Sequence, residues 1–300
     1  MVEKAQEKKR RKILVTGSSG MLGTDLCNEL KSEYDIVGLD ISGQGDFVRC
    51  DITDKDKVVK SILNAKPDLV IHAAAWTDVD GCEREPDKAR KVNEGGTRNV
   101  AKAARALDAP LVYISTDFVF DGNKKSPYTE KDAPRPLNIY SKSKLEGEKT
   151  CATLGKYIIA RSGWLYGSNG NNFVDTIIEK AKKESELRVV DDQWGSPTYT
   201  EDFAKAIGKL LSAQGANGIY HISNKGEVSW FDYAREILKI AGVNNVKLIP
   251  INSSQLGRPA KRPAFSVLDN TKFEKATGFI MRPWQEALKE YLCGITISKS

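Results

Sequence analysis

Histidine is scarce in this chain, in which His72 and His221 are the only two. Zinc sites are built from several histidines or from paired cysteines, so a His-rich metal site is not expected. The five cysteines are odd in number and scattered, with no Cys-x-x-Cys pair. That pattern argues against a disulfide framework and against a structural zinc site. We therefore expect free thiols in a reducing compartment and no bound metal.

Long apolar runs are missing as well. No stretch approaches the roughly 18–20 apolar residues that a membrane span requires. The N-terminal sequence MVEKAQEKKRRK has no apolar core of a signal peptide. With 40% hydrophobic and 29% charged residues, the composition is that of a globular protein. We expect a cytoplasmic protein that does not associate with membranes.

The positive charge is concentrated at one end of the chain. The formal net charge is +6, and residues 1–12 hold six Lys and Arg against two Glu. The remaining 40 basic and 38 acidic residues nearly cancel. A short basic tail of this kind is usually solvated, and the body has no excess charge that would attract nucleic acid. We expect no nucleic-acid partner.

Strand and helix patterns alternate over the first half of the chain. Short apolar, β-branched runs predict strands at 12–16, 35–39, 68–73 and 109–115. Helical periodicity predicts helices near 21–31, 55–66 and 83–107. Alternation of this kind is typical of α/β proteins in which helices cover both faces of a parallel sheet. The sequence therefore predicts a doubly wound, Rossmann-like sheet.

Three glycines stand between the first predicted strand and the first predicted helix: Gly17, Gly20 and Gly23. Glycine suits a tight turn, a close approach to pyrophosphate and close packing of helix on strand. The free N–H groups at the helix start favour phosphate. The spacing differs by one residue from the usual dinucleotide fingerprint, and no Gly-Lys-Ser/Thr follows, which excludes a Walker loop. The pattern favours a dinucleotide site over a purely structural turn.

Asp40 closes the second predicted strand, 23 residues after Gly17. A carboxylate there can accept the ribose hydroxyls of NAD and would repel the 2′-phosphate of NADP. No Arg or Lys immediately follows, so the sequence favours NAD. The alternative is a solvated turn aspartate.

Tyr140 and Lys144 are four residues apart and share one face of a helix. A nearby ammonium favours the phenolate and is expected to lower the tyrosine pKa from about 10. Such a tyrosine can donate a proton to a ketone oxygen. Thr116, 24 residues earlier and at the end of a strand, could hydrogen-bond the same oxygen. The alternatives are a surface Tyr/Lys pair and a hydroxyl that caps local backbone.

Beyond residue 165 the pattern loosens. Helices are expected near 173–183 and 199–211, a strand at 218–222, and a further helix with Ser229 as its N-cap. We divide the chain into a basic tail (1–12), an NAD(P)-binding domain (13–165) and a smaller α/β lobe for the substrate (166–300). No linker separates the lobes, so they are expected to pack closely, and the second can interleave with the first.

These motifs together resemble the extended short-chain dehydrogenases/reductases. The resemblance rests on the glycine turn, Asp40, Cys50-Asp51-Ile52, His72-Ala73-Ala74-Ala75, Thr116 and Tyr140-x-x-x-Lys144. Longer strings resemble the dTDP-4-dehydrorhamnose reductase family: STDFVFDG (115–122), NIYSKSKLEGE (138–148), RSGWLYG (161–167), VVDDQWGSPT (189–198) and GIYHIS (218–223). They span both lobes, over about residues 12–292.

The resemblance implies reduction of the C4 ketone of dTDP-4-dehydro-L-rhamnose to dTDP-L-rhamnose, with NADH or NADPH as coenzyme. Tyr140 would donate the proton, Lys144 would hold the nicotinamide ribose, and Thr116 would bind the reacting oxygen. The residues implied to bind the coenzyme are Gly17, Gly20, Met21, Leu22, Gly23, Asp40, Asp51, Ile52, Ala73, Ala74, Ala75 and Lys144.

For the dTDP-hexose, the resemblance implies that Trp164 packs on the sugar and that Asp117 hydrogen-bonds it. The diphosphate calls for amide donors and guanidinium groups, and Asn172, Arg258 and Arg262 are the candidates. Surface arginines beside prolines are equally typical of solvated loops. A homodimer is compatible with the sequence.

Two other functions fit the same motifs. The resemblance extends to the non-catalytic β subunit of methionine adenosyltransferase, a nucleotide-binding regulatory subunit. It also extends to sibling nucleotide-sugar reductases and epimerases, because the choice of sugar depends on pocket shape rather than on these motifs. We favour the reductase.

Overall fold

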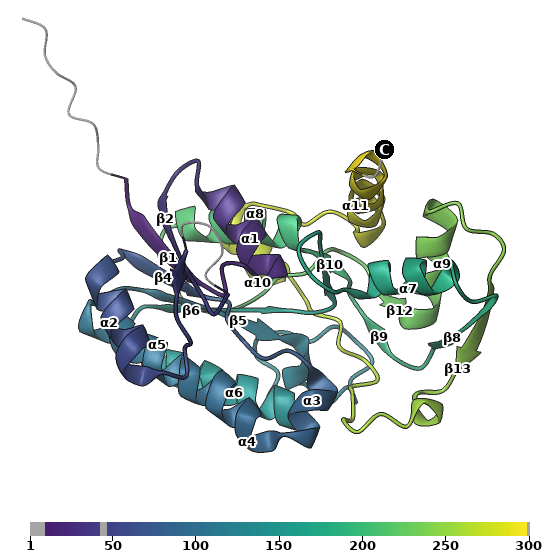
Figure 1. The fold of residues 1–300 in the computed structure, drawn as a ribbon, viewed down its shortest axis with the longest axis horizontal. Helices are drawn as coiled ribbons and strands as arrows, with labels where there is room; N and C mark the ends of the chain where they lie inside the picture. Colours follow the sequence, from purple (N-terminus) through teal and green to yellow (C-terminus); the bar gives the residue numbers. More distant parts are fainter. Residues whose placement is uncertain (1–9, 43–46, 299–300) are drawn as a thin grey trace, which may run out of the picture.

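A seven-stranded, fully parallel sheet forms the centre of the larger lobe (Figure 1). The structure is a computed structural model that describes residues 10–42 and 47–298, with side chains described up to residue 294. The sheet has the order β11-β6-β5-β4-β1-β2-β3. Its strands are β1 (Lys12–Thr16), β2 (Asp35–Asp40), β3 (Val48–Arg49), β4 (Leu69–His72), β5 (Leu111–Thr116), β6 (Tyr157–Ser162) and β11 (Gly218–His221).

Strand order reverses between β1 and β4, which places the topological switch point beside the glycine turn. Ligands of open α/β sheets bind at this point, beyond the carboxyl ends of the strands. The predicted doubly wound, Rossmann-like sheet is confirmed. Most of the predicted basic tail, residues 1–9, lies outside the described residues.

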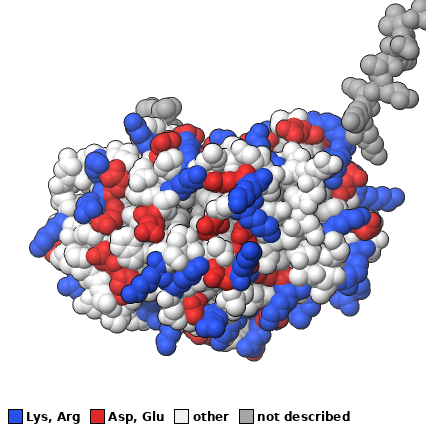
Figure 2. Space-filling view, turned by 180° about the vertical axis from the view of Figure 1, so that it is seen from behind, with Lys and Arg blue, Asp and Glu red and all other residues white. Residues whose placement is uncertain are grey.

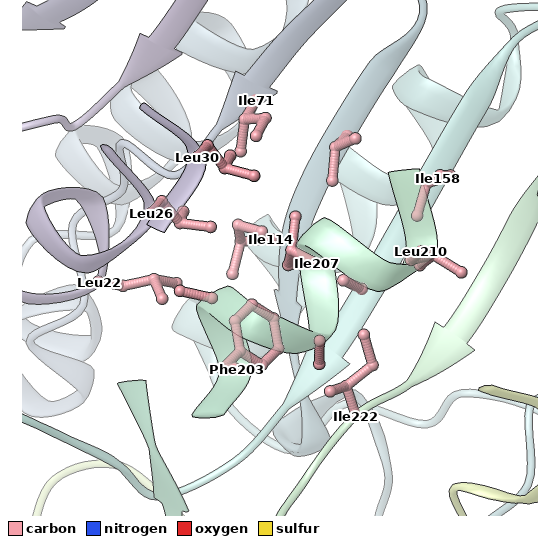
Figure 3. Packing of buried hydrophobic residues seen from close by; sticks show 14 of the residues in the cluster. Leu22, Leu26, Leu30, Ile71, Ile114, Ile158, Phe203, Ile207, Leu210 and Ile222 are labelled. Carbon is pink, nitrogen blue, oxygen red and sulfur yellow. The ribbon is translucent and has the colours of Figure 1, made fainter. Parts of the chain in front are cut away.

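Helices cover both faces of the sheet. On one face lie α1 (Met21–Leu30), α8 (Thr200–Ser212) and α10 (Thr271–Thr277), and on the other lie α2 (Lys55–Ala65), α5 (Thr97–Ala106) and α6 (Ile139–Ala152). Figure 3 shows the first interface, where Leu22, Leu26 and Leu30 of α1 meet Phe203 and Ile207 of α8. These residues recur at helical spacing, so the apolar stripes predicted from periodicity are the faces that are buried.

One long predicted helix is broken into pieces. In place of a helix over 83–107, the structure has α3 (Val79–Arg84), α4 (Pro86–Ala89), a π-helical turn (Arg90–Gly96) and α5. Glu85 leaves the helical region, with φ −126° and ψ 68°, because it precedes Pro86, which disfavours the helical conformation. The wide turn that follows brings Asn93 inward, where it is buried.

The smaller lobe lies at the right of Figure 1 and has its own core. It contains α7 (Phe173–Ala181), α9 (Trp230–Ile240), α11 (Trp284–Ser298) and three two-stranded sheets. These pair β7 (Leu165–Tyr166) with β10 (Thr198–Tyr199), β9 (Trp194–Gly195) with β12 (Val228–Ser229), and β8 (Glu186–Val190) with β13 (Lys247–Ile251). Two 3₁₀ turns, Asp117–Val119 and Ser253–Leu256, complete the described elements.

The chain crosses between the lobes more than once. Residues beyond 165 supply α8, β11 and α10 to the larger lobe, so the second half of the chain interleaves with the first. The division at residue 165 stays a prediction. Ser229 caps α9 by accepting a hydrogen bond from the Asp232 backbone N–H, as its sequence position suggests.

The surface carries both signs of charge. On the face shown in Figure 2, Lys and Arg side chains are interspersed with Asp and Glu. No helix among the described residues is long and apolar enough to cross a membrane.

Candidate active site

The glycine turn is shaped by contacts that leave no room for side chains. Gly17 has φ +71°, and a Cβ there would lie 2.7 Å from the Ala74 backbone nitrogen. A Cβ at Gly23 would lie 1.9 Å from the Gly17 carbonyl oxygen. Gly20 is the N-cap of α1 and has no side-chain cap, so the first N–H groups of the helix are free of a capping side chain. The turn therefore offers bare backbone donors to a phosphate.

Two hydroxyl groups in this turn are buried without a partner. The Oγ atoms of Ser18 and Ser19 have no hydrogen-bond partner among the described residues. Buried hydroxyls normally find one, so unsatisfied donors beside bare helix N–H groups fit an anionic ligand such as pyrophosphate. Met21 and Leu22 form the first turn of α1, next to this position.

Asp40 ends β2 and points back to the turn. Its Oδ2 accepts a hydrogen bond from the Ser19 backbone N–H (3.1 Å), and its Oδ1 accepts from the backbone N–H and the hydroxyl of Ser42 (3.0 Å each). This is the place where the adenosine ribose of a dinucleotide lies in this fold.

The other residues expected around the coenzyme follow β3 and β4. Asp51 is exposed and accepts from the Thr53 backbone N–H, while Ile52 is buried against Gly96. Ala73, Ala74 and Ala75 continue from β4, and Ala74 donates its backbone N–H to Thr16 Oγ1 (3.3 Å). Ala73 and Ala74 border the glycine turn from the side of β4, since a Cβ at Gly17 would meet their backbone.

Thr116, Tyr140 and Lys144 come together at the carboxyl edge of the sheet. Tyr140 and Lys144 lie on α6, which Asn138 caps. The side chain of Thr116, the last residue of β5, lies near the Tyr140 hydroxyl and acts to lower its pKa. Lys144 donates from Nζ to the Ile114 carbonyl oxygen (2.7 Å), and its ammonium lies 4.2 Å from the centre of the Tyr113 ring. The structure thus unites three residues that the sequence separates by up to 28 positions.

The expectation that Lys144 lowers the tyrosine pKa is not met. Burial raises the pKa of Tyr140, the charge of Asp117 raises it further, and Lys144 is not among the groups that shift it. The physical reason is that the phenol is desolvated while the ammonium is turned to a backbone carbonyl of β5. Burial lowers the pKa of Lys144 to about 8. Tyr140 is therefore protonated at neutral pH, the form that a proton donor requires.

Asp117 is the buried carboxyl group next to Thr116. Its Oδ1 accepts from Thr116 (3.0 Å), and its Oδ2 accepts from the Ser266 hydroxyl (2.5 Å). Burial raises the pKa of Asp117 to about 7, because the effect of desolvation is larger than the opposite effect of these hydrogen bonds. Gly163 makes room for the carboxylate, since a Cβ there would lie 2.5 Å from the Asp117 Cγ. Sequence reasoning missed Ser266, which is 149 residues from its partner and carries no local signal.

Trp164 lies half-buried where the lobes meet. Its indole stacks on Trp230, with ring centres 3.4 Å apart and planes inclined by 4°. Gly195 packs under the indole, and Trp164 has φ +51°, a conformation that costs a non-glycine residue energy and often marks a functional site. The Trp230 partner is a second feature that the sequence did not indicate.

The three residues expected at the diphosphate differ in their surroundings. Asn172 is the N-cap of α7, and its amide donates to the Gly167 carbonyl and to Asp175 and Tyr291, so its donors are already used. The expected diphosphate contact is therefore replaced by a structural role.

The guanidinium of Arg262 forms a two-pronged ion pair with Asp80 of α3 (3.0 and 2.8 Å). Arg258 is exposed overall, but part of its guanidinium is buried, and this burial lowers its pKa. The charge of the neighbouring Arg262 lowers the pKa further. Asp80 is paired with Arg262 alone, so the second, nearby guanidinium leaves positive charge for an anion.

Two buried polar clusters support this edge of the sheet. His72 bonds to Thr16 (2.7 Å) and Thr97 (3.0 Å), and burial lowers its pKa to about 3, so it is neutral and serves the fold. Glu148 and Arg161 form a buried ion pair with contacts of 2.8 and 2.6 Å. No group of three or more potential ligands is placed to hold a metal ion in the part of the chain that the structure describes.

Comparison with known proteins agrees with this geometry. The family model of the RmlD substrate-binding domain matches residues 11–296. The chain belongs to the RmlD substrate-binding-domain family. The family that the motifs resemble is thereby confirmed.

Similar proteins cover nearly the whole length of this RmlD-family chain. It is 41% identical to the spore coat polysaccharide biosynthesis protein SpsK of Bacillus subtilis, over 94% of this chain and 96% of that protein. It is 40% identical to the dTDP-4-dehydrorhamnose reductase of Aggregatibacter actinomycetemcomitans, over 93% and 97%. The crystal structure of dTDP-4-dehydrorhamnose reductase from Bacillus anthracis, in complex with NADP, is 39% identical, with a TM-score of 0.89 and coverage of 95% and 100%.

Proposed function

We propose that this chain reduces the C4 ketone of dTDP-4-dehydro-L-rhamnose to dTDP-L-rhamnose with NADH or NADPH, in the cytoplasm. The observation that supports the proposal most directly is that Tyr140 is protonated and lies beside Thr116 at the carboxyl edge of the sheet. Relatives named dTDP-4-dehydrorhamnose reductase, one of them in complex with NADP, support the substrate and the coenzyme.

When bound, the reduced nicotinamide supplies the hydride. Tyr140 donates its phenolic proton to the C4 oxygen, and its raised pKa keeps the phenol protonated until the reduction creates an alkoxide that is a stronger base than the phenolate. Thr116 hydrogen-bonds the same oxygen and stabilises its developing charge. Lys144 stands one helical turn from Tyr140, where its ammonium would hold the nicotinamide ribose.

The coenzyme is held along the glycine turn. The backbone N–H groups of Met21 and Leu22 would face its pyrophosphate, together with the Ser18 and Ser19 hydroxyls. Gly20, whose own N–H donates to the Gly17 carbonyl oxygen (3.1 Å), would shape the turn around the phosphates. Asp40 accepts from the adenosine ribose, and Asp51 and Ile52 border the adenine. Ala73, Ala74 and Ala75 lie behind the coenzyme.

The nucleotide sugar occupies the space between the lobes. Trp164 packs on the hexose and Asp117 hydrogen-bonds it. Arg258 and Arg262 meet the diphosphate, and Asp80 orients Arg262 for that contact. Asn172 is left out of the diphosphate site because its amide caps α7.

The test is oxidation of NADH and NADPH with freshly generated dTDP-4-dehydro-L-rhamnose, comparing the natural protein with Tyr140→Phe. Loss of the phenolic proton should lower kcat by about 10²–10⁴-fold, the usual range for a general acid. Tyr157→Phe, at the start of β6 and outside the site, is the matched control.

Each outcome separates the candidate functions. A natural protein that binds coenzyme and turns over no nucleotide-sugar ketone would favour the regulatory-subunit alternative. Turnover of only a different dTDP-4-keto sugar would identify a sibling reductase. Full activity of Tyr140→Phe would remove Tyr140 as the proton donor and leave the reductase activity itself in place.

A further inference from the structure

Pairing of β2 with β3 brings a guanidinium beside the carboxylate that ends β2. The two strands are parallel, and Arg49 is the register partner of Asp40. The Cys50 backbone N–H donates to the Asp40 carbonyl oxygen (2.8 Å) and fixes this register. Because neighbouring strands lie about 4.8 Å apart, Arg49 stands next to Asp40 at the edge of the sheet.

The Arg49 side chain is directed along this edge rather than away from it. Its Nε donates to the carbonyl oxygen of Ile41, the residue that follows Asp40 (3.2 Å). This is the single hydrogen bond found for the side chain among residues 10–42 and 47–298, and no ion pair is found for it there. Within the described part of the chain, neither terminal nitrogen of the exposed guanidinium has a partner, so both can meet a ligand.

The same edge carries further donors. The backbone N–H and the hydroxyl of Ser42 both donate to Asp40 Oδ1. These donors and Arg49 surround the place beside Asp40 where the ribose of a dinucleotide lies. The edge thus offers a carboxylate for ribose hydroxyls and, next to it, a cation and hydroxyl suited to a phosphate.

We propose that Arg49 binds the 2′-phosphate of NADPH, so that the chain accepts both coenzymes although Asp40 by itself favours NADH. The inference rests on the proposed function, because it places a nicotinamide coenzyme at this edge. A guanidinium offers two parallel N–H donors to a phosphate, and its charge offsets the repulsion from Asp40. The sequence favoured NAD because no basic residue follows Asp40 along the chain; the basic residue arrives instead through strand pairing.

The experiment measures the ratio of the dissociation constants of NAD⁺ and NADP⁺ by isothermal titration calorimetry. We expect Arg49→Ala to weaken NADP⁺ relative to NAD⁺ by about five- to tenfold, a modest factor because the pair is exposed. Arg49→Lys keeps the positive charge but lacks the two parallel N–H donors, so it should give an intermediate ratio of the two dissociation constants. Arg188→Ala, an exposed arginine on β8 in the other lobe, should keep the natural ratio.

The salt dependence of NADP⁺ binding provides an independent test. Because the contact is between exposed charges, raising the salt concentration should weaken NADP⁺ binding in the natural protein more steeply than in Arg49→Ala. The two proteins should converge at high salt.

Three outcomes would overturn the inference. If Arg49→Ala weakens both coenzymes equally, Arg49 contacts the adenine or supports the fold. If the ratio does not change, the 2′-phosphate is held elsewhere, and the proposed reductase function still stands. If neither coenzyme binds to natural protein that is folded by circular dichroism, the proposed function itself fails.

Discussion

Burial of Asp117 should impose a pH dependence on the stability of this protein. The carboxyl group is almost fully inaccessible and accepts hydrogen bonds from Thr116 and Ser266. Desolvation nevertheless raises its pKa from 3.8 to about 7. The free energy of unfolding should therefore depend on whether this one group is ionised.

The direction of the effect follows from the two pKa values. Between about pH 4 and pH 7 the folded protein keeps the Asp117 proton while the unfolded chain releases it. The resulting stabilisation is fully present below pH 4 and is lost as the pH rises through 7. The difference of about three pH units corresponds to roughly 4 kcal/mol, of which about 3 kcal/mol is lost between pH 5 and pH 8.

Urea unfolding of the natural protein and of Asp117→Asn between pH 5 and pH 8.5 measures this loss. Asparagine has nearly the same shape and does not titrate, so its stability should gain about 3 kcal/mol relative to the natural protein across this range. Asp87→Asn, at a fully exposed side chain on α4, should follow the natural curve. Parallel curves for the natural protein and Asp117→Asn would show that burial does not hold the proton on this carboxyl group.

Two further substitutions test the packing around the site. Glu148→Gln leaves the charge of Arg161 buried without its partner and should cost about 3–5 kcal/mol in urea unfolding; a loss below 1 kcal/mol would contradict a desolvated ion pair. Gly23→Ala places a methyl group against the Gly17 carbonyl and should weaken NAD⁺ and NADP⁺ alike by at least about tenfold in calorimetry. Gly155→Ala, where a methyl group meets no atom within 4 Å, should leave both affinities unchanged, and equal behaviour of the two variants would refute the close turn.

Local chemistry determined much of what could be predicted. The strands over 12–16 and 35–39 and the helices after them follow from runs of apolar residues and from helical periodicity, which depend on near neighbours alone. The approach of Gly23 to Gly17 is equally local, because a Cβ at Gly23 would lie 1.9 Å from the Gly17 carbonyl oxygen. Tyr140 and Lys144 share a face because both lie on one helix.

The predicted helix boundaries were wrong where proline restricts the residue before it. Periodicity alone predicted one helix over 83–107, although Pro86 disfavours the helical conformation at Glu85. The inward turn that follows is held by Asn93, whose side chain accepts from the Trp76 backbone N–H and donates to Ser143 (2.9 Å). Those partners lie on other elements, so no local pattern could indicate them.

The chemistry of the site was decided by tertiary structure. The sequence by itself determined that a tyrosine, a lysine and a threonine exist at suitable spacings, and that Asp40 ends a strand. Desolvation, which raises the pKa values of Tyr140 and Asp117, appears only when the chain has closed around them. Arg49 reaches Asp40 only because β3 pairs with β2. Burial and strand pairing both join residues that are distant in the chain, so sequence spacing could not show them.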